Sequence, residues 1–412
     1  MGLRRVVVTG MGVIAPTGIG PAALWEALLA NRSTVGPITA FDASTYPSRI
    51  AACCAGFEPR DHFPAARARR LGRFCQMAVA AARLALRDAR RDPAPDPRMG
   101  IFVGTACGAA QVIEEQFAVF RDKGYRRVHP MLAPMASPQA GASQIAAELG
   151  ARGPILTLSS DCPAGLDAVG VAAHEIAAGH LETALAGGVD APITPLLMIA
   201  FNRTGALSEG NADPARACRP FDRARDGFVM AEGGAFFVLE TLEAARARGA
   251  RLHGEVLGIG WGTDPSSEFG RAVGSDGFEA AMRDALRAAG LAPGGVGLIC
   301  AHAPGIPATD LAEACAIASL HESAATQPLV TSIKGAVGQA LAGGAALQVA
   351  VALTALAEGA VPPTVNCEDP DPGCPVAVVR GKAARGALRT ALVNSHGFGG
   401  NNTALLVGSP PA

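Results

Sequence analysis

Residues 154–169 read PILTLSSDCPAGLDAV, and this stretch decides the fold class. An apolar run over residues 154–158 is typical of a short buried strand. Small and polar residues then form a turn, and Pro163 suits the first position of a helix. Cys162 is therefore predicted to lie where a strand turns into a helix.

The same alternation of short apolar runs and longer helical patterns continues in both directions, which predicts an α/β protein with buried strands. Strands are expected over residues 5–10, 100–104, 154–158, 183–188 and 235–239, and in a second series over 254–257, 296–300, 329–332, 390–394 and 403–407. The turn-rich segment 11–18 is expected to end the first strand. The two series predict an N-terminal half (residues 1–250) and a C-terminal half (residues 251–412), packed as one body because no low-complexity linker separates them.

Composition narrows the class of protein. Among 412 residues, 49% are hydrophobic and 17% charged, which indicates a compact, well-buried enzyme, and a net charge of −1 argues against nucleic acid or an anionic membrane as the main partner. The ten cysteines are scattered, and the adjacent pair Cys53 and Cys54 does not suit zinc, so we expect a reducing cytoplasm rather than a disulfide framework. The uncharged stretch Ala340 to Ala357 is rich in Ala and Gly, and we interpret it as a buried helix of a soluble protein rather than a membrane span.

The glycine-rich opening suggests one alternative, a dinucleotide-binding loop. Gly10 and Gly12 follow a predicted strand, but the next glycine is Gly18, which comes after Pro16. This spacing is a poor match to G-x-G-x-x-G, so the sequence does not predict a nicotinamide cofactor.

Cys162 is the first candidate for catalysis. A cysteine at a helix N-terminus feels the positive end of the macrodipole, which favours the thiolate and is expected to lower the pKa of the thiol. A buried structural cysteine is the competing interpretation. A thiolate nucleophile also needs a partner such as an imidazole. His302 and His396 both follow predicted strands, and periodicity does not choose between them.

Almost the whole chain resembles the β-ketoacyl-acyl-carrier-protein synthases, the elongating condensing enzymes of fatty acid and of aromatic or polyene polyketide synthesis. The resemblance implies a duplicated five-layered α/β/α/β/α thiolase-like fold and a dimer formed through the region near Cys162. It rests on an ordered set of segments: residues 8–12 (VTGMG), the Cys162 turn, 219–222 (RPFD) with 225–229 (RDGFV), 301–302 (AH), 332–335 (SIKG), 361–366 (VPPTVN) and 394–402 (NSHGFGGNN).

The resemblance also implies roles for individual residues. Cys162 would receive the acyl chain, and His302 would assist decarboxylation of a malonyl extender. Lys334 and Glu313 resemble a charged pair that supports the site from behind. The remaining roles are an oxyanion hole made by the backbone N–H groups of Cys162 and Phe398, and entrances for the malonyl and acyl groups shaped by Phe228 and Phe398. The family implies no metal or nucleotide cofactor, because its substrates are thioesters on the phosphopantetheine of an acyl carrier protein.

Three positions depart from the family pattern. Gln339 stands where the family has a second histidine, although an amide can still donate a hydrogen bond to a thioester carbonyl. After His302 the chain reads APGI instead of G-T-G-T, so the two threonines that bind the phosphopantetheine arm are missing. His396 replaces a Phe beside the gate and adds a titratable group near the pocket.

These departures leave alternatives open. Acyl transfer to Cys162 followed by decarboxylative Claisen condensation is the main hypothesis. The other class is a chain-length-factor-like subunit, a degenerate partner of an active ketosynthase, although such subunits typically lack the cysteine that is present here. A non-extending acyltransferase is a third possibility. The sequence leaves open whether the dimer is with itself or with a related ketosynthase subunit.

Overall fold

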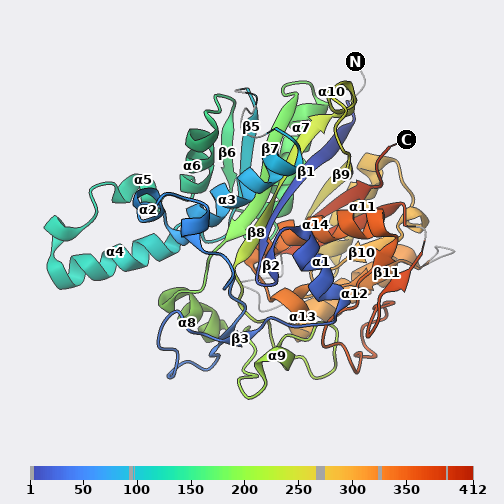
Figure 1. The fold of residues 1–412 in the computed structure, drawn as a ribbon. Coiled ribbons are helices and arrows are strands. Elements are labelled where there is room, and N and C mark those ends of the chain that lie inside the picture. Colours follow the sequence, from blue (N-terminus) through green and yellow to red (C-terminus); the bar gives the residue numbers. More distant parts are fainter. Residues whose placement is uncertain are drawn as a thin grey trace.

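One large mixed sheet organises the chain (Figure 1). The computed structural model describes residues 4–91, 96, 98–265, 274–322, 327–386 and 388–411. The strands follow the order β11-β10-β14-β15-β9-β1-β8-β7-β5-β6, with the short β2 paired to β1. Their bounds are β1 Val6–Ala15, β2 Gly18–Ile19, β5 Gly100–Gly104, β6 Ile155–Leu158, β7 Thr183–Asp190, β8 Gly233–Thr241, β9 Gly254–Thr263, β10 Leu298–Cys300, β11 Leu329–Thr331, β14 Thr390–His396 and β15 Asn401–Gly408. Two separate two-stranded sheets pair β3 (Gly36–Pro37) with β4 (Ile50–Ala51), and β12 (Ala360–Val361) with β13 (Ala384–Arg385).

The sheet is built from one pattern used twice. In the first half β5 lies parallel to β6 and β7, and β8 then pairs antiparallel to β7 and β1. In the second half β10 lies parallel to β11 and β14, and β15 pairs antiparallel to β14 and β9. Within the sheet, the two halves meet over three residue pairs between β1 and β9, from Val6↔Val256 to Val8↔Gly254. The fold is therefore duplicated, while the division of the chain at residue 250 stays a prediction.

Helices form three layers around these two half-sheets. α7 (Ala164–Ala177) and α14 (Leu341–Glu358) lie between them, in contact with strands of both halves. The outer face of the first half is covered by α3 (Arg73–Asp88) and α6 (Ala140–Leu149), and that of the second by α11 (Asp276–Ala289) and α12 (Pro307–His321). The layers alternate α/β/α/β/α, which confirms the predicted thiolase-like architecture.

The remaining helices are shorter or lie outside these layers, except α13, which is completely buried. In Figure 1, α4 extends away from the sheet as an arm, with α5 beside it. The bounds are α1 Pro21–Leu29, α2 Ala65–Ala68, α4 Ala110–Lys123, α5 Leu132–Ala136, α8 Pro195–Thr204, α9 Pro214–Ala217, α10 Leu242–Ala247 and α13 Lys334–Val337.

The opening glycines lie inside a strand, so the expectation that segment 11–18 forms a turn is wrong for its first half. β1 continues to Ala15 because α3 packs directly against it. A Cβ atom at Gly10 would lie 2.2 Å from the carbonyl oxygen of Ala85, and one at Gly12 would lie 2.0 Å from that of Ala81. Glycine is required here for close approach of helix and sheet, not for a turn or a phosphate.

α14 contains the uncharged stretch noted in the sequence. It is long and apolar enough to cross a membrane by length and composition alone. It lies between the two half-sheets, however, and most of its residues are completely buried in the main hydrophobic core. α14 is therefore a core helix, as the sequence predicts.

Candidate active site

Cys162 lies in the turn between β6 and α7, as the sequence predicts, and its side chain is almost completely buried. Pro163 is the N-cap residue of α7, one position before the helix starts. Asp161, just before the cysteine, has a positive φ of 63°, which Asp tolerates better than most residues do. This turn places Cys162 in the wall of a cavity of about 260 Å³.

Residues that are far apart in the sequence line this cavity together. Two of the predicted site residues, Lys334 and Glu313, are not part of its wall and are buried behind it. The lining comprises the predicted residues Cys162, Phe228, His302, Gln339, His396 and Phe398, together with Thr204, Gly205, Ala206, Pro304, Ile306, Thr309 and Leu341.

The environment of the thiol does not favour the thiolate. Burial raises the pKa of Cys162 well above its ordinary value, the Asp161 carboxylate adds to the increase, and Lys334 opposes it. The sequence predicted a lowered pKa for this thiol, but the pKa is raised, and desolvation by burial is the largest cause. Gln339 Nε2 donates to Cys162 Sγ at 3.4 Å, and in the described part of the chain no histidine lies within hydrogen-bond distance of this sulfur.

His302 is held at the end of β10 by its own backbone. The carboxylate of Glu313 accepts hydrogen bonds from the backbone N–H of His302 at 2.9 Å and of Ala303 at 2.8 Å. Burial, together with the charge of Lys334 and the nearby His396, lowers the pKa of the imidazole well below its ordinary value. This shift favours the neutral imidazole, and the Nδ1 atom of His302 has no hydrogen-bond partner among the described residues.

Lys334 and Glu313 flank His302 but do not form a direct ion pair within the described ranges. Lys334 Nζ donates to Gln348 Oε1 at 2.7 Å and to the His302 carbonyl at 3.3 Å. Gln348 Nε2 in turn donates to carbonyl oxygens of residues 300, 301 and 394. Sequence reasoning missed the role of Gln348. The available signal was a lone amide in an otherwise apolar helix, since a buried polar group needs partners.

His396 faces His302 across the cavity. Its ring stacks on Phe278 at 4.9 Å between centroids and meets the His302 ring edge-on at 6.0 Å. Asn402 Nδ2 donates to a backbone carbonyl, so Asn402 Oδ1 accepts from His396 Nδ1–H at 2.9 Å; the other ring nitrogen, Nε2, has no hydrogen-bond partner among the described residues. Burial lowers the pKa of His396, although the Asn402 hydrogen bond opposes this.

The predicted gate is an aromatic cluster. Phe228 and Phe398 lie 6.4 Å apart between ring centroids, and Phe201 of α8 lies 5.8 Å from each. Phe201 was not foreseen, because nothing in its local sequence distinguishes it from an ordinary apolar residue of a helix.

The two backbone N–H groups that are expected to form the oxyanion hole differ in whether they already have a hydrogen-bond acceptor. The backbone N–H of Cys162 has no acceptor among the described residues, whereas that of Phe398 donates to Asp161 Oδ2 at 2.8 Å. The expectation of two available N–H groups is therefore only half met, because the chain's own Asp161 carboxylate engages the second. Asp161 was missed because its partner lies 237 positions away.

The segment after His302 lines the cavity without the two threonines of the family pattern. Pro304 and Ile306 present apolar surface there. The cavity has other hydroxyl-bearing residues in its wall, since Thr309 in the first turn of α12 and Thr204 at the end of α8 also line it.

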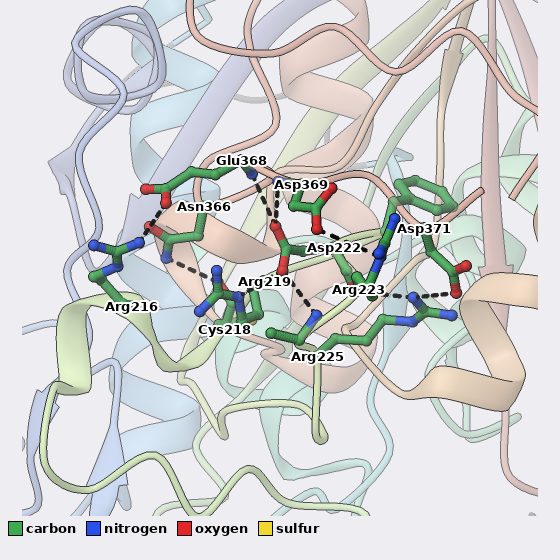
Figure 2. A network of polar contacts seen from close by, with 12 residues as sticks. Arg216, Cys218, Arg219, Asp222, Arg223, Arg225, Asn366, Glu368, Asp369 and Asp371 are labelled. Atoms are coloured by element: carbon green, nitrogen blue, oxygen red, sulfur yellow. Dashed lines mark hydrogen bonds and ion pairs between the residues drawn. The ribbon is translucent and has the colours of Figure 1, made fainter. Parts of the chain in front are cut away.

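A polar network around Asp222 (Figure 2) holds the segment that precedes Phe228 in the chain. The Asp222 carboxylate accepts from Arg219 Nε at 3.0 Å and from the backbone N–H groups of residues 224, 368 and 369, each at 2.9 Å. Burial alone would raise the pKa of Asp222, but these hydrogen bonds outweigh it and lower the pKa. Arg225 donates to Asp371 at 2.8 Å and lies 3.6 Å from Asp310 at the start of α12. The network therefore ties one wall of the cavity to the element that follows His302.

Comparison with known proteins identifies the family of this arrangement. Residues 3–245 match the family "Beta-ketoacyl synthase, N-terminal domain", and residues 253–368 match "Beta-ketoacyl synthase, C-terminal domain". The chain is 37% identical over 404 residues to 3-oxoacyl-[acyl-carrier-protein] synthase 2 of Synechocystis, covering 98% of this chain and 97% of that protein. It is 40% identical over 419 residues to putative polyketide beta-ketoacyl synthase 1 of Streptomyces halstedii, covering 99% and 98%.

The architecture agrees with these matches. The solved structure of the ishigamide ketosynthase/chain length factor superposes with a TM-score of 0.91 at 34% identity, and all of both chains is covered. The chain belongs to the β-ketoacyl synthase family, the condensing acyltransferases of the thiolase superfamily, as the resemblance read from its sequence implied.

Proposed function

We propose that this protein is a β-ketoacyl-ACP synthase of fatty acid or type II polyketide synthesis that loads an acyl group onto Cys162 and extends it with malonyl-ACP. The observation that carries the proposal is the single cavity that brings the Cys162 thiol together with two imidazoles and an amide donor. A degenerate cysteine without chemistry would not require these polar groups in a mostly buried wall.

In the first half-reaction, Cys162 Sγ attacks the carbonyl carbon of the acyl thioester. The new C–S bond replaces the bond to the phosphopantetheine sulfur, which leaves with the proton of the thiol. Because burial raises the thiol pKa, this proton must be lost as the sulfur attacks. Gln339 Nε2, 3.4 Å from the sulfur, stabilises the thiolate character of that state. The N–H groups of Cys162 and Phe398 are the proposed donors to the oxyanion.

In the second half-reaction, malonyl-ACP loses carbon dioxide and its enolate carbon attacks the acyl group on Cys162. A C–C bond forms and the Cys162 thiolate leaves. Neutral His302 can hold the enolate oxygen through an N–H group, and Lys334 and Glu313 position its backbone. His396 lines the same cavity with its ring centroid 6.0 Å from that of His302, and we propose it as the second imidazole of the site.

The partners follow from the same chemistry. The name of the Synechocystis relative includes the acyl carrier protein, and we propose such a carrier, with its phosphopantetheine-linked thioester, as the substrate donor. The proposal needs no metal or nucleotide. We further propose a dimer, with itself or with a related ketosynthase subunit, acting in the cytoplasm.

Specific observations favour a second candidate, a chain-length-factor-like subunit. The Phe398 N–H is engaged by Asp161, the Cys162 pKa is raised, and Gln339 replaces a histidine. The ishigamide structure pairs a ketosynthase with a chain length factor in its name. In this alternative the cavity would shape a product made by a partner subunit.

Intact-protein mass spectrometry decides between the two. The protein is mixed with acyl carrier proteins that carry different acyl groups, alone and with a co-expressed ketosynthase. An acyl adduct that disappears in Cys162→Ala supports acyl transfer, and adding malonyl-ACP then tests condensation. If no carrier yields an adduct under either condition, the catalytic proposal fails and the chain-length-factor proposal replaces it.

A further inference from the structure

Asp161 occupies a donor that acyl transfer would use. Its Oδ2 atom accepts the backbone N–H of Phe398 at 2.8 Å, and the residue directly precedes Cys162. A carboxylate is a stronger acceptor than the carbonyl of a thioester, because its hydrogen bonds are charge-assisted. The N–H group is therefore already satisfied before any substrate arrives.

The surrounding chain is built to permit this contact. Asp161 has a φ of 63°, in the left-handed region. A Cβ atom at Gly397 would lie 3.0 Å from Asp161 Cβ, so the close approach of the two segments depends on a glycine at that position. Asn401 Nδ2 also donates to the carbonyl oxygen of Ser160, which fixes the glycine-rich segment to the cysteine turn from a second point.

The consequence for acyl transfer is direct. A tetrahedral intermediate on Cys162 carries a negative oxygen that needs N–H donors. Here the Cys162 N–H has no acceptor in the described part of the chain, while the Phe398 N–H faces a carboxylate that also repels an incoming negative charge.

Taking the proposed acyl transfer as its basis, we propose that Asp161 is a positioning residue that holds the Phe398 N–H away from substrate and limits acyl transfer to Cys162. Transfer proceeds only when the substrate oxygen displaces the Asp161 carboxylate from that N–H. The residue thereby sets the rate of the loading step and disfavours thioesters that bind too weakly to displace it.

Two reactions of the Cys162 sulfur distinguish an effect of Asp161 on the oxyanion donor from an effect of Asp161 on the reactivity of the thiol. Alkylation of Cys162 by iodoacetamide depends on the thiolate but forms no oxyanion. Acyl transfer from an octanoyl-carrier thioester depends both on the thiolate and on donors that stabilise an oxyanion. Peptide mapping assigns the alkylation to Cys162 among the ten cysteines.

Three variants complete the design. Asp161→Asn removes the charge but keeps an acceptor of the same shape, so it is the matched control. Asp161→Ala and Asp161→Gly remove the acceptor, and glycine accepts the positive φ without strain. Thermal unfolding of each variant checks that the fold is retained.

We expect alkylation to be equally fast in all three variants, because each removes the same charge. Acyl transfer should be about tenfold or more faster in the Ala and Gly variants than in the Asn variant, as removing or restoring one oxyanion donor changes rates by at least that factor. If the ratio of acyl transfer to alkylation is the same in the Asn, Ala and Gly variants, the inference is overturned while the proposed function stands. If none of the proteins, the Ala and Gly variants included, forms an acyl adduct although Cys162 is alkylated, both the inference and the proposed acyl transfer fail.

Discussion

Replacing Gln339 with Met tests how the cavity controls the reactivity of Cys162. Gln339 Nε2 donates to Cys162 Sγ at 3.4 Å, and it is the side-chain donor to this sulfur in the portion of the chain that the structure describes. Met has similar length and flexibility but no N–H group, so the substitution removes the hydrogen bond without opening a large cavity.

The expected shift follows from the energy of one charge-assisted hydrogen bond. Such a bond contributes about 1.5–3 kcal/mol, and one pKa unit corresponds to about 1.4 kcal/mol. The pKa of Cys162, which burial already raises, should therefore rise by about one to two further units in Gln339→Met. At a given pH the thiolate should become about 10- to 100-fold scarcer.

The same substitution should not lower the stability of the protein. Gln339 Oε1 is buried and has no donor among the described residues. Met removes this unpaired oxygen, and a buried unpaired polar atom costs about 1–3 kcal/mol. The free energy of unfolding should therefore stay the same or increase, which would mark Gln339 as a residue kept for chemistry rather than for stability.

The pH dependence of Cys162 alkylation, followed by peptide mapping, measures the thiol pKa, and urea denaturation measures stability. Gln339→His is the matched control, because its ring N–H can restore the donor and should return the pKa toward that of the native protein. The reasoning is refuted if Gln339→Met leaves the pH profile unchanged, or if it lowers stability by more than about 2 kcal/mol.

Three further predictions concern the groups around Cys162. Lys334→Met should lower the free energy of unfolding by about 1–3 kcal/mol, because the buried Gln348 Oε1 loses its donor; unchanged urea denaturation would contradict this. His302→Asn should reduce the loss of stability on acidification. The pKa of His302 is lower in the folded protein than in the unfolded chain, where it is about 6.5. The stability that His302 contributes is therefore fully present above about pH 6.5. It decreases by about 1.4 kcal/mol for each pH unit below that value. Urea titrations at about pH 6 and about pH 5 test this, and an equal loss in both proteins would disprove it. His396→Phe should keep the stacking on Phe278 and change stability by less than about 1 kcal/mol, yet slow condensation about 100-fold relative to acyl loading. Parallel loss of both half-reactions would remove the role of His396 as second imidazole.

The fold was predictable because its signals are local. Each predicted strand overlaps an observed one, from β5 at 100–104 to β15 at 401–408, since short β-branched runs between turn residues need no distant information. The end of β1 was the part not predicted, because the segment that begins with Met11 and Gly12 resembled a turn. The requirement for Gly10 and Gly12 comes from α3, which packs against the strand from residues more than sixty positions later in the chain.

In the candidate site, too, local sequence signals were predictable and long-range contacts were not. The amino-acid sequence by itself determined the α/β class, the strand–turn–helix position of Cys162 and, through its ordered motifs, six of the residues that line the cavity. Tertiary structure alone decided the state of those residues. The pKa of Cys162 is raised rather than lowered, Lys334 pairs with Gln348 rather than Glu313, and Asp161 holds the Phe398 N–H. Burial and side-chain partners arise only when the chain packs into its tertiary structure, and burial is the largest cause of the raised pKa of Cys162.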